Sequence, residues 1–146
     1  MTGFDSLHAV DHAQAAAQCA DVCIEVGVLP AELAPVRVVA ADLAARADFD
    51  LDAVADLRMA VDEACSTLAT LARPGDRLHC MLQVDSDRIT MVARIPAQEA
   101  SAIAQDTFGW RVLTTLTDEV ELLSEMKSGV SSLGIRLVKA RRVATT

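Results

Sequence analysis

Hydrophobic and polar residues alternate in five short segments of the chain, and this spacing of two is typical of strands with one buried face. The segments are residues 22–28, 77–84, 88–95, 118–126 and 132–142. Only short turns separate the second segment from the third and the fourth from the fifth, the last turn passing through Gly129. Each of these two pairs is therefore predicted to run antiparallel.

Apolar residues recur every three or four positions in three other segments, which predicts helices over residues 31–47, 48–72 and 110–117. Pro35 is expected in the first turn of its helix, where the missing N–H is harmless. In the longest segment, Asp48 or Asp50 is the expected N-cap. Its predicted buried face consists of Leu57, Val61, Ala64, Leu68 and Leu71.

The order of these elements predicts an α+β fold. It has the form of a two-layer α/β sandwich, in which about three helices cover one face of a mixed, mostly antiparallel sheet. Residues 1–18 show no clear period and are interpreted as a loose N-terminal arm. Residues 19–146 are interpreted as a single domain, which suits the length of 146 residues.

Composition and charge narrow the class of protein. Apolar residues make up 52% of the chain, which argues against disorder. The formal charge is -8, and residues 1–71 carry 12 acidic and only 3 basic side chains. No basic face is evident, so direct nucleic-acid binding is not expected. An acidic surface suits a basic protein partner, although solvation alone also explains it.

Two observations concern location. No apolar run approaches the roughly 20 residues that a membrane helix needs. Neither Lys nor Arg occurs among the first residues, so the basic start of a signal peptide is missing. A cytoplasmic protein without a membrane association is therefore expected.

Four cysteines are present: Cys19, Cys23, Cys65 and Cys80. The spacing of Cys19 and Cys23 fits a metal or redox pair, but no second pair completes a zinc pattern, and free thiols are the favoured interpretation. Four residues on a strand span roughly 13 Å, so no Cys19–Cys23 disulfide is expected. Cys65 is predicted to be partly buried.

A polar stripe on the longest predicted helix is the main candidate site. On a helical wheel Glu63 points roughly 130° from the centre of the apolar face and Thr67 roughly 90°. A carboxylate with hydroxyls beside it can bind a cation or orient water, whereas the simpler interpretation is a solvated helix edge. The stripe comprises Asp56, Met59, Glu63, Ser66, Thr67 and Thr70.

The stretch "LRMAVDEACSTLATLA", residues 57–72, resembles the N-box helix of the anti-sigma-factor branch of the histidine-kinase-like ATPase superfamily. Those helices read roughly L-x-L-A-V-x-E-A-x-x-N-A. "LPAELAPVRVVAADLA" is similar to the preceding helix of that family and "FGWRVLTTLTDEVEL" to its second glycine box. The resemblance covers roughly residues 22–142. It implies the Bergerat fold of that superfamily, a sheet with helices on one face.

The resemblance also implies a nucleotide site, with ATP and magnesium as possible cofactors. Glu63 stands at the position of the family's catalytic base, but Thr67 replaces the magnesium-binding Asn. Arg94 replaces the adenine-reading Asp. Gly109 is the one glycine kept from the phosphate box, and the bulky Trp110 follows it. These residues are interpreted as a degenerate nucleotide pocket in which Glu63 is a vestigial base, with no separate metal site.

Three functions remain open at this stage. The favoured one is an anti-sigma factor that sequesters an alternative, stress-response sigma factor like sigma F or sigma B. By resemblance it is countered by a STAS-domain anti-anti-sigma factor and forms a homodimer. The second is an active serine/threonine kinase that phosphorylates the STAS protein. The third is a thiol-responsive regulatory protein that uses Cys19 and Cys23.

Overall fold

The computed structural model describes residues 20–96 and 102–142 of the chain. The loose arm predicted for residues 1–18, and Cys19 with its predicted lack of a disulfide, lie outside the described residues. The described elements, in chain order, are β1 (Ala20–Gly27), α2 (Pro30–Arg46), α3 (Leu51–Leu71), β2 (Arg77–Val84), β3 (Arg88–Pro96), α4 (Phe108–Leu116), β4 (Glu119–Lys127) and β5 (Val130–Ala140).

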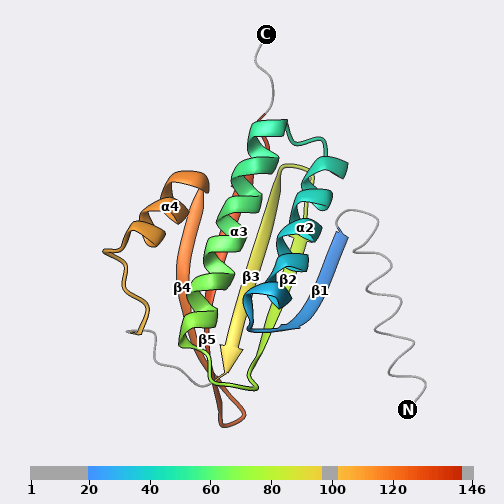
Figure 1. Ribbon diagram of the computed structural model, residues 1–146. Helices are drawn as coiled ribbons and strands as arrows, with labels where there is room; N and C mark the ends of the chain where they lie inside the picture. Colours follow the sequence, from blue (N-terminus) through green and yellow to red (C-terminus); the bar gives the residue numbers. More distant parts are fainter. Residues whose placement is uncertain (1–19, 97–101, 143–146) are drawn as a thin grey trace, which may run out of the picture.

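The five strands form one sheet in the order β1-β2-β3-β5-β4. The predicted α+β class and its two-layer arrangement are confirmed: α2 and α3 lie across one face of the sheet, and α4 lies beside α3 near β4 (Figure 1). Every pairing among the described strands is antiparallel, so this part of the sheet is not mixed. The reason is that β5 inserts between β3 and β4, which run in the same direction and would otherwise have been parallel neighbours.

Alternation along the strands separates a face under the helices from an open face. In β2, Leu78 and Leu82 are fully buried, while His79 between them is exposed. The same alternation holds in β3, where each inward residue is hydrophobic. Ser128 and Gly129 have positive φ angles of 54° and 78°, as a tight hairpin turn between β4 and β5 requires.

The helices begin where the sequence supplies caps. Asp50 caps α3, its Oδ1 accepting a hydrogen bond from the N–H of Ala53 at 2.7 Å. Pro30, rather than Pro35, occupies the first turn of α2, so the predicted position of Pro35 is wrong. Pro35 lies one turn further along on the exposed side of the helix. Water can there satisfy the carbonyl that lacks its helical donor.

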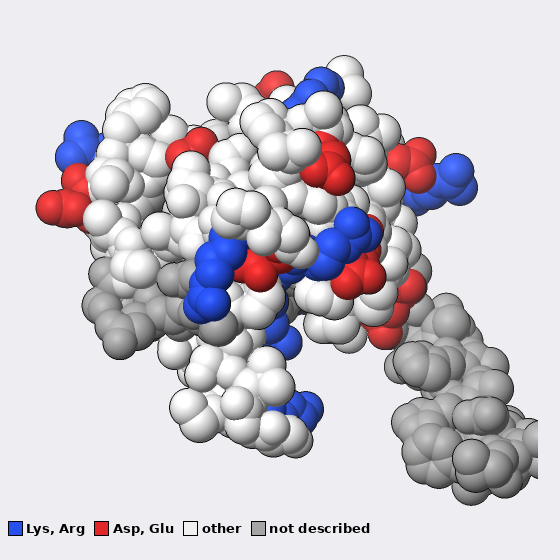
Figure 2. All heavy atoms as spheres, turned by 60° about the horizontal axis from the view of Figure 1, so that its bottom comes forward, with Lys and Arg blue, Asp and Glu red and all other residues white. Residues whose placement is uncertain are grey.

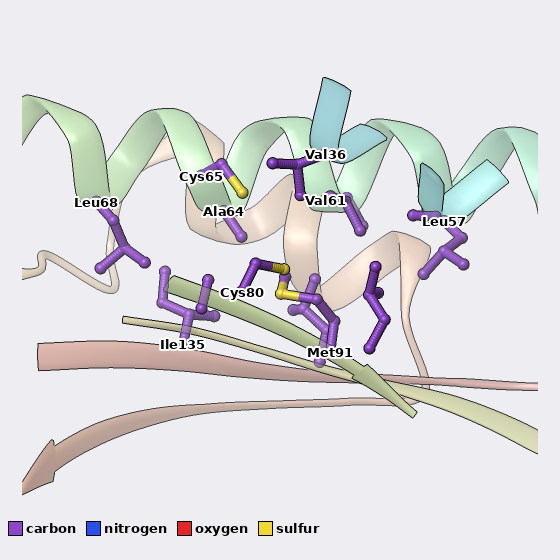
Figure 3. Close-up of a cluster of buried hydrophobic side chains, with 14 of the residues drawn as sticks. Val36, Leu57, Val61, Ala64, Cys65, Leu68, Cys80, Met91 and Ile135 are labelled. Carbon is purple, nitrogen blue, oxygen red and sulfur yellow. The ribbon is translucent and has the colours of Figure 1, made fainter. Parts of the chain in front are cut away.

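The core lies between the sheet and the two long helices. Leu57, Val61, Ala64 and Leu68 are fully buried on α3, and they point toward the sheet (Figure 3). Cys65 is only 1% exposed, and thus more buried than its place on the helical wheel predicts, because α2 packs along that side of α3. No helix in the described part of the chain is long and apolar enough to span a membrane.

Candidate functional site

A pocket of about 330 Å³ opens between the polar edge of α3 and the segment that leads into α4. The helix contributes one carboxylate and three hydroxyl groups, which belong to the last four of the six residues in the polar stripe predicted from the sequence. The lining residues are Glu63, Ser66, Thr67, Thr70, Leu71, Ala102, Ile103, Ala104, Thr107 and Gly109.

The first turn of α4 forms one wall of this pocket. Thr107 caps the helix, its Oγ1 accepting a hydrogen bond from the N–H of Trp110 at 3.1 Å. Gly109 in the same turn lies directly against Glu63, and a methyl group at Gly109 would occupy the place of Glu63 Oε1. A larger residue at position 109 would therefore require the flexible Glu63 side chain to move, while the φ angle of Gly109 is ordinary.

The structure thus brings together three of the predicted site residues, Glu63, Thr67 and Gly109. Glu63 and Thr67 are half-buried, because the segment before α4 covers an edge of α3 that a helical wheel alone leaves exposed. Thr107 was missed by sequence reasoning. Its signal was its position as a helix-capping residue just before a glycine-containing first turn.

Arg94 does not reach this pocket. Its neighbours Ala93 and Ile95 face the helices and are buried, so the alternation of β3 turns Arg94 to the open face of the sheet. There Nη2 of Arg94 donates a hydrogen bond to Oε1 of Glu125 on β4, at 3.0 Å. Gly134 lies opposite Arg94 on the intervening strand β5, and the missing side chain leaves room for the guanidinium to cross.

Trp110 also lies apart from the pocket lining. Its side chain is half-buried and packs against the hydrophobic core, although its neighbour Gly109 lines the pocket. The first turn of a helix points successive side chains in directions about 100° apart, which accounts for the difference. The structure therefore gives Trp110 the role of a core residue of α4.

Charges near the pocket are unevenly balanced. Asp56 and Asp62, on the same helix as Glu63, each face a cation: Lys139 Nζ lies 3.4 Å from Asp56, and Arg37 Nη1 lies 3.0 Å from Asp62. Glu63 has no ion-pair partner among the residues that the structure describes. No Lys or Arg lines the pocket.

The described lining lacks the cations that usually bind the triphosphate of ATP. No lysine or arginine is among the described lining residues, and the Glu63 carboxylate at the start of α4 would repel a phosphate. The donors that remain are hydroxyl groups and the N–H groups of the first turn of α4. Ala93 and Ile95, the inward residues near the end of β3, offer no acceptor for the amino group of adenine. Within the described residues, no three His, Cys, Asp or Glu side chains gather in a way that could hold a metal ion.

Buried thiols lie behind the same helix. Burial raises the pKa of the Cys80 thiol to about 12, and burial together with the nearby Cys80 and Asp62 also raises the pKa of Cys65. Neither thiol is a reactive thiolate near neutral pH. Cys23 on β1 is exposed, and all three described cysteines are free.

Comparison with known proteins agrees with this fold. Residues 26–139 match the family model of the histidine kinase-like ATPase domain. Two proteins of Mycobacterium tuberculosis, from strains CDC 1551 / Oshkosh and ATCC 25618 / H37Rv, both carry the name anti-sigma-F factor RsbW. Each is 34% identical to this chain over 117 residues, which cover 78% of this chain and 69% of the relative.

Proposed function

Because the chain belongs to the histidine kinase-like ATPase family, in the branch of the RsbW-type anti-sigma factors, we propose that it binds an alternative sigma factor and thereby represses transcription. The observation that carries the proposal is the 34% identity to an anti-sigma-F factor over most of both chains. Sigma binding requires a surface rather than a catalytic centre. The features missing from the pocket therefore do not argue against it.

The surface suits an electrostatically guided encounter. The excess of acidic side chains lies in residues 1–71, which include both long helices. On the face drawn in Figure 2, acidic and basic side chains lie next to one another rather than forming a broad basic patch. Acidic residues on exposed positions of α2, such as Glu32 and Asp42, would steer a basic sigma surface, as we expect for a charge-assisted protein interface.

We propose further that the nucleotide site is degenerate. The supporting observations are the pocket lining without a cation, the Thr at position 67 and the apolar inward end of β3. Two lost charge-assisted contacts, each of about 1.5–3 kcal/mol, weaken binding roughly a hundredfold to ten-thousandfold. We expect ATP affinity to be weak or undetectable, and Thr67→Asn alone not to restore it, because the adenine contact is still missing.

The alternative function is an active serine/threonine kinase acting on a STAS-domain anti-anti-sigma factor. The observation in its favour is Glu63, which stands at the position of the family's base and lines the pocket. Radiolabelled phosphate transfer with magnesium, millimolar ATP and the cognate STAS protein separates the two functions. Stoichiometric phosphorylation that disappears in Glu63→Ala would establish the kinase, whereas no transfer supports a protein that the STAS partner releases by binding alone.

Co-purification from the native cell, followed by mass spectrometric identification of the bound proteins, tests the principal proposal. Recovery of an alternative sigma factor, and of a STAS protein under inducing stress, is the expected result. The proposal also includes a cytoplasmic location and a homodimer. Light scattering of the purified protein tests the homodimer separately. Repeated recovery of neither protein class would count against an anti-sigma function.

A further inference from the structure

Three half-buried carboxylates lie along α3, and among the described residues two of them have a cationic partner while Glu63 has none. Asp56 is paired with Lys139 from β5 and Asp62 with Arg37 from α2. Glu63 belongs to the same helix and is likewise half-buried, but it faces the pocket instead of a basic side chain. A carboxylate that is partly removed from water is best stabilised by an opposite charge.

No Lys, Arg or His is among the described residues that line this pocket. The arginines nearest to the lining residues in sequence, Arg58, Arg73, Arg94 and Arg111, are not part of the described lining. Asp106, next to the lining residue Thr107, is a further acidic residue. A cation near Glu63 must therefore come from another part of the chain or from a second molecule.

We propose that this pocket receives a cationic side chain, an arginine or lysine of the bound partner protein. The lining matches such a group in chemistry. The Glu63 carboxylate offers a charged acceptor, and the hydroxyls of Ser66, Thr67 and Thr70 line the same pocket along α3 as further acceptors. Guanidinium and ammonium groups are donors only, so they pair with this set of oxygens.

Two local contacts bear on the acceptor groups of this pocket. The Glu63 carboxylate lies against Gly109 in the first turn of α4, so a larger residue at position 109 would have to displace it. Thr70 Oγ1 donates to the Thr67 carbonyl at 2.7 Å, which leaves the lone pairs of that hydroxyl free to accept. The site of a lost nucleotide contact thus becomes a specificity pocket for a protein.

The cation chemistry can be tested without a partner. Nitrogen-15 NMR titration with N-acetyl-arginine amide should give saturable shifts confined to residues around Glu63 and Gly109. The neutral isostere N-acetyl-citrulline amide is the matched control and should give none. Glu63→Gln should weaken the binding at least about tenfold, as expected for a charge-assisted contact. Asp52→Asn, at the exposed far end of α3, should leave it unchanged.

The identity of the donor rests on the proposed function and needs a second arm. If a partner side chain fills the pocket, N-acetyl-arginine amide should compete with the purified sigma factor, and Glu63→Gln should weaken sigma binding. Sigma binding insensitive to both, with the arginine probe still bound, would overturn the partner assignment and indicate a free small cation such as agmatine. The cation pocket and the anti-sigma function can thus fail independently.

Two results would overturn the pocket itself. One is no site-specific shift with N-acetyl-arginine amide in folded protein. The other is tighter binding of ATP with magnesium than of the arginine probe. Should Glu63→Gln fail to fold, Gly109→Ala serves in its place, because its methyl group displaces the same carboxylate. Unchanged affinity for the probe in that variant would equally contradict the proposal.

Discussion

Native thiol reactivity should distinguish Cys23 sharply from Cys65 and Cys80. The perturbation is a thiol reagent, dithionitrobenzoate, added to a Cys19→Ser variant so that only the three described cysteines remain. Cys23 is exposed on β1, whereas Cys65 is 1% and Cys80 2% exposed beneath the helices. One equivalent of thiol should therefore react rapidly, and two should react only when the protein unfolds.

The magnitude follows from the raised pKa of Cys80. At pH 8 an ordinary thiol of pKa about 8.5 is roughly one-quarter thiolate. A pKa of about 12 leaves on the order of one thiolate in ten thousand. Reaction of Cys80 should thus be slower by at least roughly 2000-fold, and burial against the reagent adds to this factor. The additional change Cys23→Ser should abolish the rapid phase.

The same pKa predicts how stability depends on pH. The Cys80 thiol loses its proton near pH 8.5 in the unfolded chain but only near pH 12 in the folded protein. The unfolded state then binds fewer protons, so the free energy of unfolding should fall between these values by up to about 1.4 kcal/mol per pH unit. Cys80→Ala should reduce this slope.

In the thiol assay, rapid reaction of a second equivalent of thiol with dithionitrobenzoate, while the circular dichroism spectrum stays unchanged, would refute the assignment of Cys65 and Cys80 as protected.

Two further predictions concern contacts that the structure alone shows. Lys139, with a side chain 9% exposed, also donates to the Leu116 carbonyl at the end of α4, at 2.9 Å. Lys139→Met should lower the free energy of unfolding in urea by about 1.5–3 kcal/mol. The double variant Lys139→Met, Asp56→Asn should lower it by less than the sum of the two single variants. Lys127→Met, at the exposed hairpin end of β4, should leave it almost unchanged. Gly134→Ala places a methyl group 2.6 Å from the Ala93 carbonyl oxygen. It should lower stability by about 1–3 kcal/mol, and a stable Gly134→Ala protein would contradict the close approach of β3 and β5.

Most of the element order could be predicted from the sequence, because alternation and helical spacing are local signals. The strands at 77–84 and 88–95 and the core positions of α3 were placed closely for this reason. The position of β5 between β3 and β4 could not be predicted, since no local signal reports which strand inserts between two others. Pro35 was placed one turn too early because Pro30 had been assigned to the end of the preceding strand.

The candidate site was predictable only in part, for reasons of direction and distance. Glu63 and Thr67 could be predicted together because their spacing of four places them on one side of a helix. Gly109 could be added because it belongs to the stretch that resembles the second glycine box. Arg94 was matched to the adenine-reading Asp of the family by sequence position alone, whereas the alternation of β3 decides which face of the sheet its side chain occupies. The pairing of Asp56 with Lys139 joins residues 83 positions apart, beyond the reach of any pattern.

The anti-sigma function is tested most directly by calorimetric titration of the purified protein with the alternative sigma factors of its own cell. The titration is carried out without nucleotide and at two ionic strengths. The acidic excess and the proposed loss of the nucleotide site predict saturable binding of one sigma factor without ATP, weakened by moderate salt. Binding to no sigma factor, or binding that appears only with ATP and magnesium, would contradict this account of the protein.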